Sequence, residues 1–300
     1  MILRQSVVTL LITLAAYSAA SWAQAAPTFE RVLDKPCRAL ALDREPYWAA
    51  LGDDVATVGD ERGVHEEKLP DALRGADKEL GIYFGRDYRI RIAGTAHTAK
   101  RDEARYYRSL PGGLRPAHDE LGPLGKTGAP ALFTLLGTAD PEIVCRAGMS
   151  CLIKTIKGWS KASAPAGLER VGLSIGGGWA IAGPSFYKLE KDWVALPAGP
   201  WRKASDGFRR EDRACVIERD ANRMHHFDGK AWYSSTAPVL GPRSLWGGSE
   251  SLWIAGDAGV SVWRDGAFKK TSAPTEAVQV LGRSETDVWI CSAQGVFRSR

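Results

Sequence analysis

Several features common in other protein classes are missing from this chain. Beyond the first 25 residues it has no run of about 18 apolar residues, so it lacks a candidate membrane-spanning helix. It has no block of five like charges, and its net charge of +5 comes from interspersed basic and acidic residues. This excludes the basic tract typical of nucleic-acid binding. The five histidines show no His-x-His or His-x₃-His spacing, so we expect neither a metal nor a cofactor.

The first 25 residues have the composition of a removable leader. Arg4 precedes an apolar stretch over residues 7–20, and Ala23-Gln24-Ala25 forms a small-x-small cleavage site. This order predicts a signal peptide over 1–25 and a mature domain over 26–300. No cysteine follows the apolar stretch closely, so we expect no lipid anchor and no membrane insertion. The mature chain is therefore expected in the periplasm or outside the cell.

Cysteine is sparse, with five residues, and an odd number leaves at least one unpaired within a chain. Cys145 and Cys151 flank a short turn between two strand-like segments, so a hairpin would place them opposite each other. An oxidising compartment favours a disulfide between them, and two buried free thiols are the alternative. The pairing of Cys37, Cys215 and Cys291 stays open.

A repeat organises the mature chain. Three similar tetrapeptides end at Pro165, Pro238 and Pro274, and the last two prolines are 36 residues apart. The unit over 244–274 contains four short strand-like runs separated by turns. Four antiparallel strands in about 36–40 residues are typical of one blade of a β-propeller.

Prolines mark the ends of the predicted blades. They are Pro36, Pro70, Pro111, Pro165, Pro197, Pro238 and Pro274, which predicts seven blades. Toward the N-terminus the repeat is weaker. There we align residues 54–59 with the second strand of a blade, which makes Asp60 part of the turn between the second and third strands.

The two ends of the chain complement each other. The last unit stops at Arg300 without a fourth strand, and residues 28–35 have the form of one. We therefore expect this N-terminal strand to join the C-terminal blade, which closes the ring and removes an exposed sheet edge.

One predicted unit is too long. Residues 112–128 are rich in glycine and proline and form a predicted loop insertion. In a four-stranded blade, such an inter-blade connection lies on the same side as the turns between second and third strands. Long loops of compact domains are often functional.

With these repeats, the chain resembles the seven-bladed β-propellers of bacterial exported proteins. The segment over 245–268 is similar to the tryptophan- and glycine-rich repeats of large propeller families, and more distantly to kelch and BNR repeats. The resemblance implies an all-β fold and no particular activity.

Two short motifs have structural explanations. Residues 172–176 match the G-x-S-x-G nucleophile motif, but a strand-like segment follows where that motif needs a helix. The Asp-Gly pairs at 228–229 and 265–266 are interpreted as hairpin turns. His226 occupies the repeat position of Trp263, so we expect it to be a packing residue.

The sequence favours a non-enzymatic binding or scaffold protein. We expect a monomer that recognises a protein, peptide or glycan through one face of the ring, without nucleic acid. The alternative is a propeller-type hydrolase or lyase acting on glycans or lactones. The candidate ligand-binding residues are the charged residues of the predicted insertion and of one turn: Arg115, His118, Asp119, Glu120, Arg219 and Arg223.

Overall fold

The computed structural model describes residues 27–74, 78–85, 87–97, 102–117, 131–134, 142–146, 150–155 and 158–300. The predicted signal peptide and residues 118–128 of the predicted insertion lie outside the described residues. Regular structure within the described part is almost entirely strand, with one short 3₁₀ helix, η1 (Asp71–Leu73). In the same residues, no helix is long and apolar enough to cross a membrane.

The described strands form seven antiparallel sheets of four strands each. The sheets of the N-terminal half contain β2 (Ala39–Leu42), β3 (Trp48–Leu51), β4 (Val55–Asp60) and β5 (Gly63–Lys68); β6 (Lys78–Phe84), β7 (Ile90–His97), β8 (Asp102–Leu110) and β9 (Gly113–Pro116); and β10 (Ala131–Thr134), β11 (Glu142–Arg146), β12 (Ser150–Thr155) and β13 (Gly158–Ser163).

The remaining sheets contain β14 (Leu168–Ser174), β15 (Gly177–Ala182), β16 (Ser185–Leu189) and β17 (Trp193–Ala195); β18 (Asp206–Arg210), β19 (Arg213–Glu218), β20 (Arg223–Phe227) and β21 (Trp232–Thr236); β22 (Pro242–Gly247), β23 (Leu252–Gly256), β24 (Gly259–Arg264) and β25 (Ala267–Lys270); and β26 (Ala277–Ser284), β27 (Asp287–Ser292), β28 (Gly295–Ser299) and β1 (Phe29–Leu33).

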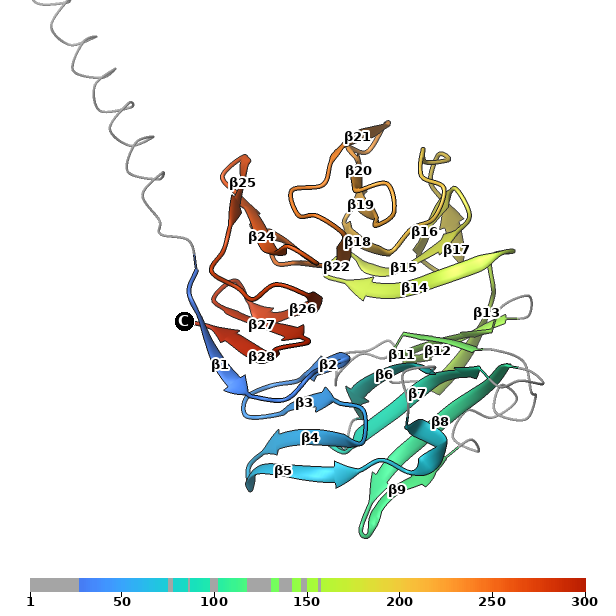
Figure 1. The fold of residues 1–300 in the computed structure, drawn as a ribbon. Helices are drawn as coiled ribbons and strands as arrows, with labels where there is room; N and C mark the ends of the chain where they lie inside the picture. The colour runs from blue at the N-terminus through green and yellow to red at the C-terminus, as the bar shows by residue number, and fades with distance from the viewer. Residues whose placement is uncertain are drawn as a thin grey trace, which may run out of the picture.

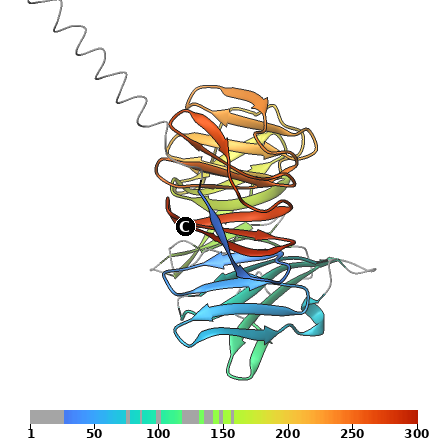
Figure 2. The ribbon, with the colours of Figure 1, turned by 60° about the vertical axis from the view of Figure 1, so that its left-hand side comes forward.

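The sheets are the blades of a propeller. They stand around a common centre, and neighbouring innermost strands such as β2 and β6, or β22 and β26, contact each other (Figure 1). Figure 2 shows the blades packed face against face. Within a blade, alternate strand direction puts the turn between the second and third strands on the same side as the connection to the next blade. We call this side the connection face and the other side the opposite face.

The core lies between the blades. Second strands are apolar on both sides because they pack against two neighbouring sheets, as in β23, where Trp253 and Ile254 are fully buried. Glycines on the innermost strands leave room for aromatic rings from the preceding blade. A Cβ atom at Gly247 would lie 2.3 Å from the Phe208 ring, and one at Gly282 would lie 2.5 Å from Trp246. Residue size at these two positions therefore sets how closely the blades approach.

The Asp-Gly pairs are hairpin turns, as the sequence predicts. Between β24 and β25, Asp265 and Gly266 both have positive φ angles, of 53° and 83°. Those angles match the type I′ turn that fits the twist of a two-residue hairpin. At the equivalent turn before β21, the Asp228 carboxylate accepts hydrogen bonds from the backbone N–H groups of Lys230 and Ala231.

The predicted closure of the ring is confirmed. β1 pairs with β28 in antiparallel register, with Phe29 opposite Ser299 and Arg31 opposite Phe297 (Figure 2). A disulfide that the sequence left open reinforces this pairing, because Cys37, between β1 and β2, bonds to Cys291 on β27. The segment over 29–37 is therefore joined to the last blade by both hydrogen bonds and a covalent bond.

The predicted disulfide between Cys145 and Cys151 is present. Cys145 on β11 lies opposite Cys151 on β12, and their sulfurs are bonded with a Cα–Cα distance of 4.0 Å. Cys215 is the one free cysteine and is buried. Burial raises the pKa of its thiol to about 12, and the nearby Asp206 carboxylate adds to the shift.

The predicted alignment of the first blade is wrong by one strand. Residues 55–60 form the third strand, β4, because the short alanine-rich segments 39–42 and 48–51 are the first two strands. Asp60 therefore belongs to the turn before the outermost strand, β5, and lies on the opposite face. The alanines pack closely within the core, with Ala49 and Ala50 almost completely buried, and Trp48 is the one aromatic residue of these two segments.

The boundary predicted at Pro111 and the start of the predicted 112–128 insertion are also wrong. Residues 113–116 are the outermost strand, β9, of the second blade, and Leu114 on it is buried. Gly112 and Gly113 have φ angles of 94° and 106°, which turn β8 into β9. The glycines therefore mark a hairpin within the blade. The other six prolines each follow an outermost strand, as predicted.

Candidate binding site at the channel mouth

A central channel is lined by residues of six of the blades. It has a volume of about 680 Å³ and is lined by the innermost strands β2, β6, β14, β18, β22 and β26. Each of these strands begins at the connection face, so residues near their starts surround the mouth of the channel on that side. Arg38, Arg170, Ser205 and Arg243 occupy these positions.

A carboxylate holds two of the mouth arginines in place. Asp257, in the β23–β24 turn, accepts a hydrogen bond from Arg243 Nε at 2.7 Å and forms an ion pair with Arg219 Nη2 at 3.2 Å. Partial burial opposes ionisation, but the hydrogen bonds from Arg243 and Arg219 hold the pKa of the Asp257 carboxyl below its usual value. Two cations share one anion here, which leaves a local excess of positive charge.

The guanidinium groups remain accessible to a ligand. The side chains of Arg219 and Arg243 are 44% and 32% exposed. Arg170 is exposed and has no ion-pair partner among the described residues. Gly241 allows this arrangement, because it has a φ of 61° and a Cβ atom there would lie 2.2 Å from an Asp257 carboxylate oxygen.

Inside the channel, polar side chains tie consecutive innermost strands together. In each case a side chain of one blade accepts a hydrogen bond from a backbone N–H of the next. The bonds run from Leu245 N–H to Asp206 Oδ2 (2.8 Å), from Val280 N–H to Ser244 Oγ (3.3 Å) and from Leu40 N–H to Gln279 Oε1 (2.7 Å). Asp206 therefore places an ionisable group at a position that neutral residues fill in the next two blades.

The Asp206 carboxyl is poised to titrate near neutral pH. Burial raises its pKa to about 6, although hydrogen bonds from two backbone N–H groups and the positive charge of Arg170 favour the ionised form. Buried carboxyls with shifted pKa values are common at functional sites. Among the described residues of the channel, Asp206 is therefore a group that can exchange a proton near neutral pH.

The sequence-predicted site residues do not all meet. Arg219 and Arg223 flank the β19–β20 turn on the connection face, as expected. Arg115 lies instead on the outermost strand β9, at the rim of the ring. His118, Asp119 and Glu120 lie outside the described residues.

Sequence reasoning missed Arg38, Arg170, Arg243 and Asp257. The first three are at or just before the starts of innermost strands, so a correct blade alignment would have grouped them. Asp257 lies far from Arg219 in the sequence, and only the folded ring brings the two side chains together.

The prediction that His226 packs in the core is wrong. His226 is exposed and stacks on Tyr233, with ring centroids 5.2 Å apart. Its neighbour His225 is buried instead, with Nδ1 2.8 Å from Ser234 Oγ, and burial lowers its pKa. The repeat correspondence with Trp263 is also wrong, because Phe227 pairs with Trp232 as Trp263 pairs with Phe268, so His226 corresponds to Val262.

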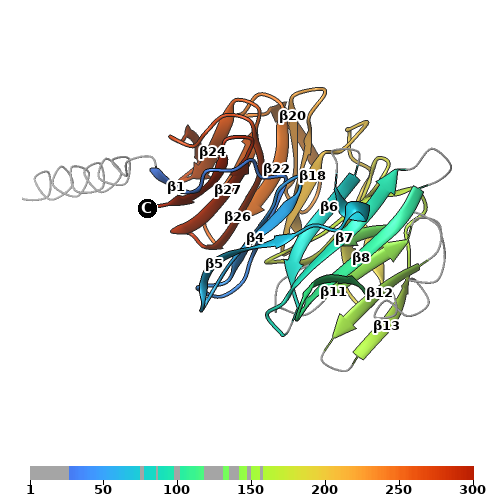
Figure 3. The ribbon, with the colours of Figure 1, turned by 60° about the horizontal axis from the view of Figure 1, so that its bottom comes forward.

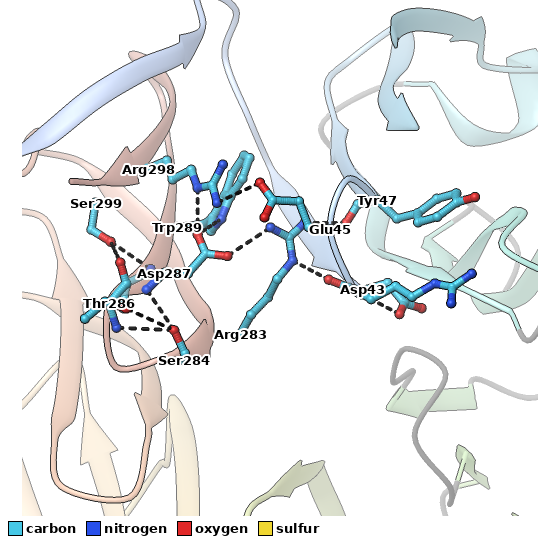
Figure 4. A network of polar contacts seen from close by, with 12 residues as sticks. Asp43, Glu45, Tyr47, Arg283, Ser284, Thr286, Asp287, Trp289, Arg298 and Ser299 are labelled. Atoms are coloured by element: carbon cyan, nitrogen blue, oxygen red, sulfur yellow. Dashed lines mark hydrogen bonds and ion pairs between the residues drawn. The ribbon is translucent and has the colours of Figure 1, made fainter. Parts of the chain in front are cut away.

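A dense polar network on the opposite face joins the last blade to the first (Figure 4). Arg283 donates hydrogen bonds to the main-chain oxygens of Asp43 and Tyr47 and to Asp287 Oδ2 at 3.0 Å. Asp287 Oδ1 accepts a second hydrogen bond, from Arg298 Nε at 2.7 Å. Burial opposes ionisation, but these arginines keep the pKa of the Asp287 carboxyl below its usual value. The groups are already paired with each other, so the network clamps the ring where it closes.

The described residues contain no cluster of three or more histidine, cysteine or acidic side chains that could hold a metal ion.

Comparison with known proteins shows the fold. No protein-family model matches the chain, and no curated protein sequence matches it. Among solved structures, it is similar to a streptogramin B lyase, with a TM-score of 0.62 and 13% identity over 92% of this chain and 98% of the lyase. It is equally similar to YCF48 bound to a D1 peptide, with a TM-score of 0.63 and 14% identity over 92% and 95% of the two chains.

A third similar structure is the WD40 propeller domain of Doa1, with a TM-score of 0.61 and 8% identity over 91% of this chain and 95% of that one. With the blades described above, these likenesses define the chain as a β-propeller. At such low sequence identities, these similarities show the fold and do not show a function.

Proposed function

We propose that this chain is an exported, monomeric propeller that binds an acidic segment of a protein or peptide at the mouth of its channel. The observation that supports this most directly is the group of arginines around that mouth, the exposed Arg170 and Arg219 and the half-buried Arg243. Guanidinium groups pair with carboxylates through two parallel hydrogen bonds. The rigid blades hold these arginines at fixed spacing, which lowers the entropy cost of binding.

Three further features fit this proposal. The channel wall below the arginines is partly apolar, with Leu40, Tyr83 and Trp246, and would accept an apolar side chain beside the acidic group. Arg223, exposed at the start of β20, would extend the cationic surface. The two disulfides fit an oxidising, extracytoplasmic location, for which the N-terminal leader would be the signal.

The test is binding of a labelled peptide to the mature chain, followed by fluorescence anisotropy. The probe carries an Asp-Glu pair beside an apolar residue, and its matched peptide carries Asn-Gln. We expect tighter binding of the acidic peptide. Arg170→Ala and Arg219→Ala should each weaken it about tenfold, the loss expected for one charge-assisted hydrogen-bonded contact.

Arg210→Ala is the matched control. It removes the same charge from an exposed position at the end of β18, on the opposite face. Unchanged affinity in Arg170→Ala and Arg219→Ala, or an equal loss in Arg210→Ala, would refute the proposal. Selective binding of acidic oligosaccharides at the same arginines would place the ligand among glycans instead of peptides.

A second candidate, a hydrolase or lyase acting on glycans or lactones, is favoured by Asp206. A carboxyl whose pKa is about 6 can give and take a proton near neutral pH. Its test is a turnover screen with glycans and lactones. Activity that follows a pKa near 6 and disappears in Asp206→Asn would support it. Activity that survives this substitution, or no turnover at all, would reject it.

A further inference from the structure

A second cavity lies far from the channel, at the rim of the ring. It has a volume of about 860 Å³ and is lined mainly by the outermost strands β5 and β9 of two neighbouring blades. Figure 3 turns the blades of β2–β5 and β6–β9 toward the viewer, with β5 and β8 labelled. We call this cavity the rim groove. The channel-mouth arginines do not line it, so its role is independent of the proposed function.

The rim groove is rich in cationic side chains. Those that line it are Arg62, Lys68, Arg74, Arg89 and Arg115, with His65 beside them and Glu66 and Glu67 as the acidic residues. Positive charge therefore exceeds negative charge in a concave surface, which attracts and concentrates anions.

Some of this charge is already neutralised. Arg62 forms an ion pair with Asp60 at 2.6 Å, and Arg74 forms one with Asp71 at 2.8 Å. Glu66 pairs with Lys35, which lies outside the lining of the groove.

Three of the lining cations have no such partner. Lys68, Arg89 and Arg115 are exposed, and none forms an ion pair with a carboxylate among the described residues. They come from three different segments: the end of β5, the β6–β7 turn and β9. Because three separate elements bring unpaired cations to one groove, an anionic ligand would be met from several sides.

The groove also contains a hydrogen-bond acceptor that is only half used. Glu67 Oε1 accepts a hydrogen bond from Ser109 Oγ at 2.6 Å, and Glu67 Oε2 is buried with no hydrogen-bond partner in the described part of the chain. The last torsion of a glutamate side chain is soft, so a small rotation would present this oxygen to the groove. It would then accept a hydrogen bond from a hydroxyl group of a ligand.

The shape favours a linear ligand. The groove follows β5, whose six residues extend over about 17 Å at the rise of a strand. At one end, the Gly112–Gly113 turn carries no side chain, and an added Cβ at Gly113 would meet nothing within 4 Å. A chain molecule could therefore leave the groove at that end.

We propose that the rim groove binds an acidic polysaccharide, whose carboxylate or sulfate groups pair with Lys68, Arg89 and Arg115 and whose hydroxyls reach Glu67. A sugar chain supplies both kinds of group along one strand of polymer. A polyanion without hydroxyls would use the cations and leave the Glu67 acceptor unpaired, which costs binding energy.

The test uses a heparin-derived octasaccharide and isothermal titration calorimetry with the mature, disulfide-bonded chain. We expect binding that weakens as NaCl is raised from about 50 mM to about 300 mM, because exposed charges are screened. Lys68→Ala/Arg115→Ala should weaken binding at least about tenfold. Glu67→Gln keeps an oxygen for the hydrogen bond from Ser109 but replaces the free carboxylate oxygen with an amide N–H₂ group, which cannot accept a hydrogen bond, so it should weaken binding of the octasaccharide but not of poly-aspartate.

A matched control removes two cations from another outermost strand. Lys269→Ala/Lys270→Ala, on β25, should bind the octasaccharide as the unchanged chain does. The substituted residues of the Lys68/Arg115 variant are exposed, so its melting temperature should stay close to that of the unchanged chain.

Three results would overturn the proposal. One is full affinity in Lys68→Ala/Arg115→Ala, and another is an equal loss in the β25 control. The third is tighter binding of poly-aspartate, or of vesicles rich in phosphatidylglycerol, than of the octasaccharide at these same residues. None of these outcomes bears on the peptide assay at the channel mouth, which depends on Arg170 and Arg219.

Discussion

The Cys37–Cys291 disulfide should contribute far more to stability than Cys145–Cys151. The first joins residues separated by 254 positions and the second joins residues separated by 6. All four cysteines are at least 98% buried, so removal of either pair disturbs the core to a similar degree. The two disulfides therefore differ mainly in how strongly they restrict the unfolded chain.

The expected magnitudes follow from loop length. The chain-entropy relation predicts about 5.5 kcal/mol for a loop of this longer separation and about 2 kcal/mol for the shorter one. The difference of roughly 3 kcal/mol should appear as a melting temperature lower by about 6–10 °C for a domain of this size. Compact unfolded states reduce both numbers, and the longer loop should still have the larger effect.

The assay compares Cys37→Ala/Cys291→Ala with Cys145→Ala/Cys151→Ala. Each variant is unfolded with urea and by heating under non-reducing conditions, and circular dichroism follows the loss of structure. Equal losses of stability in the two variants would refute the reasoning, as would a larger loss in the Cys145/Cys151 variant. Either result would mean that the β1–β28 hydrogen bonds alone determine closure, or that the unfolded chain is not the state that the disulfide restricts.

Three further predictions concern single residues. The pKa of Asp206 is about 6 in the folded chain and near 3.8 in the unfolded chain. The free energy of unfolding should therefore fall by about 2–3 kcal/mol as the pH rises from about 4 to about 6. Urea unfolding curves of Asp206→Asn should lack this part of the pH dependence. Arg283→Ala should lower the free energy of unfolding by about 2–3 kcal/mol, because it removes one partner of the largely buried Asp287 carboxylate. Unchanged unfolding curves would show that the polar network between the last and first blades does not stabilise the ring. A colorimetric thiol reagent should detect a single thiol, Cys215, in the denatured, non-reduced chain. In the folded chain Cys215 should not react, since burial raises the pKa of its thiol to about 12. A rapid reaction of the folded chain would contradict this burial.

Much of the fold could be predicted from local pattern. Four short strands per repeat, aromatic residues before a proline, and Asp-Gly turns recur because each blade has the same four strands and packs against a neighbouring blade on each side. The missing last strand predicted closure by residues 28–35, since an unpaired sheet edge must find a partner. Cys145 and Cys151 were predictable because a short hairpin places its two ends opposite each other.

The N-terminal blades were harder to predict for a physical reason. The first two strands of the first blade are rich in alanine and leucine and contain a single tryptophan, Trp48, so the repeat is weak there and its alignment slipped by one strand. Gly112 and Gly113 gave the same signal as an inter-blade loop, although they turn one strand into the next within a blade. A glycine indicates a backbone with a positive φ angle, but it does not indicate which two strands the turn connects.

The sequence alone determined the blade, the closing strand and the local disulfide, because each depends on residues close together in the chain or on an edge that must be paired. Only the tertiary structure decided that Cys37 meets Cys291, that Arg219 meets Asp257, and that Arg115 belongs to the rim and not to the channel mouth. These contacts depend on how the blades twist and stack around the ring. A change of one strand in alignment moves a side chain from one face of the ring to the other, so local sequence pattern cannot specify them.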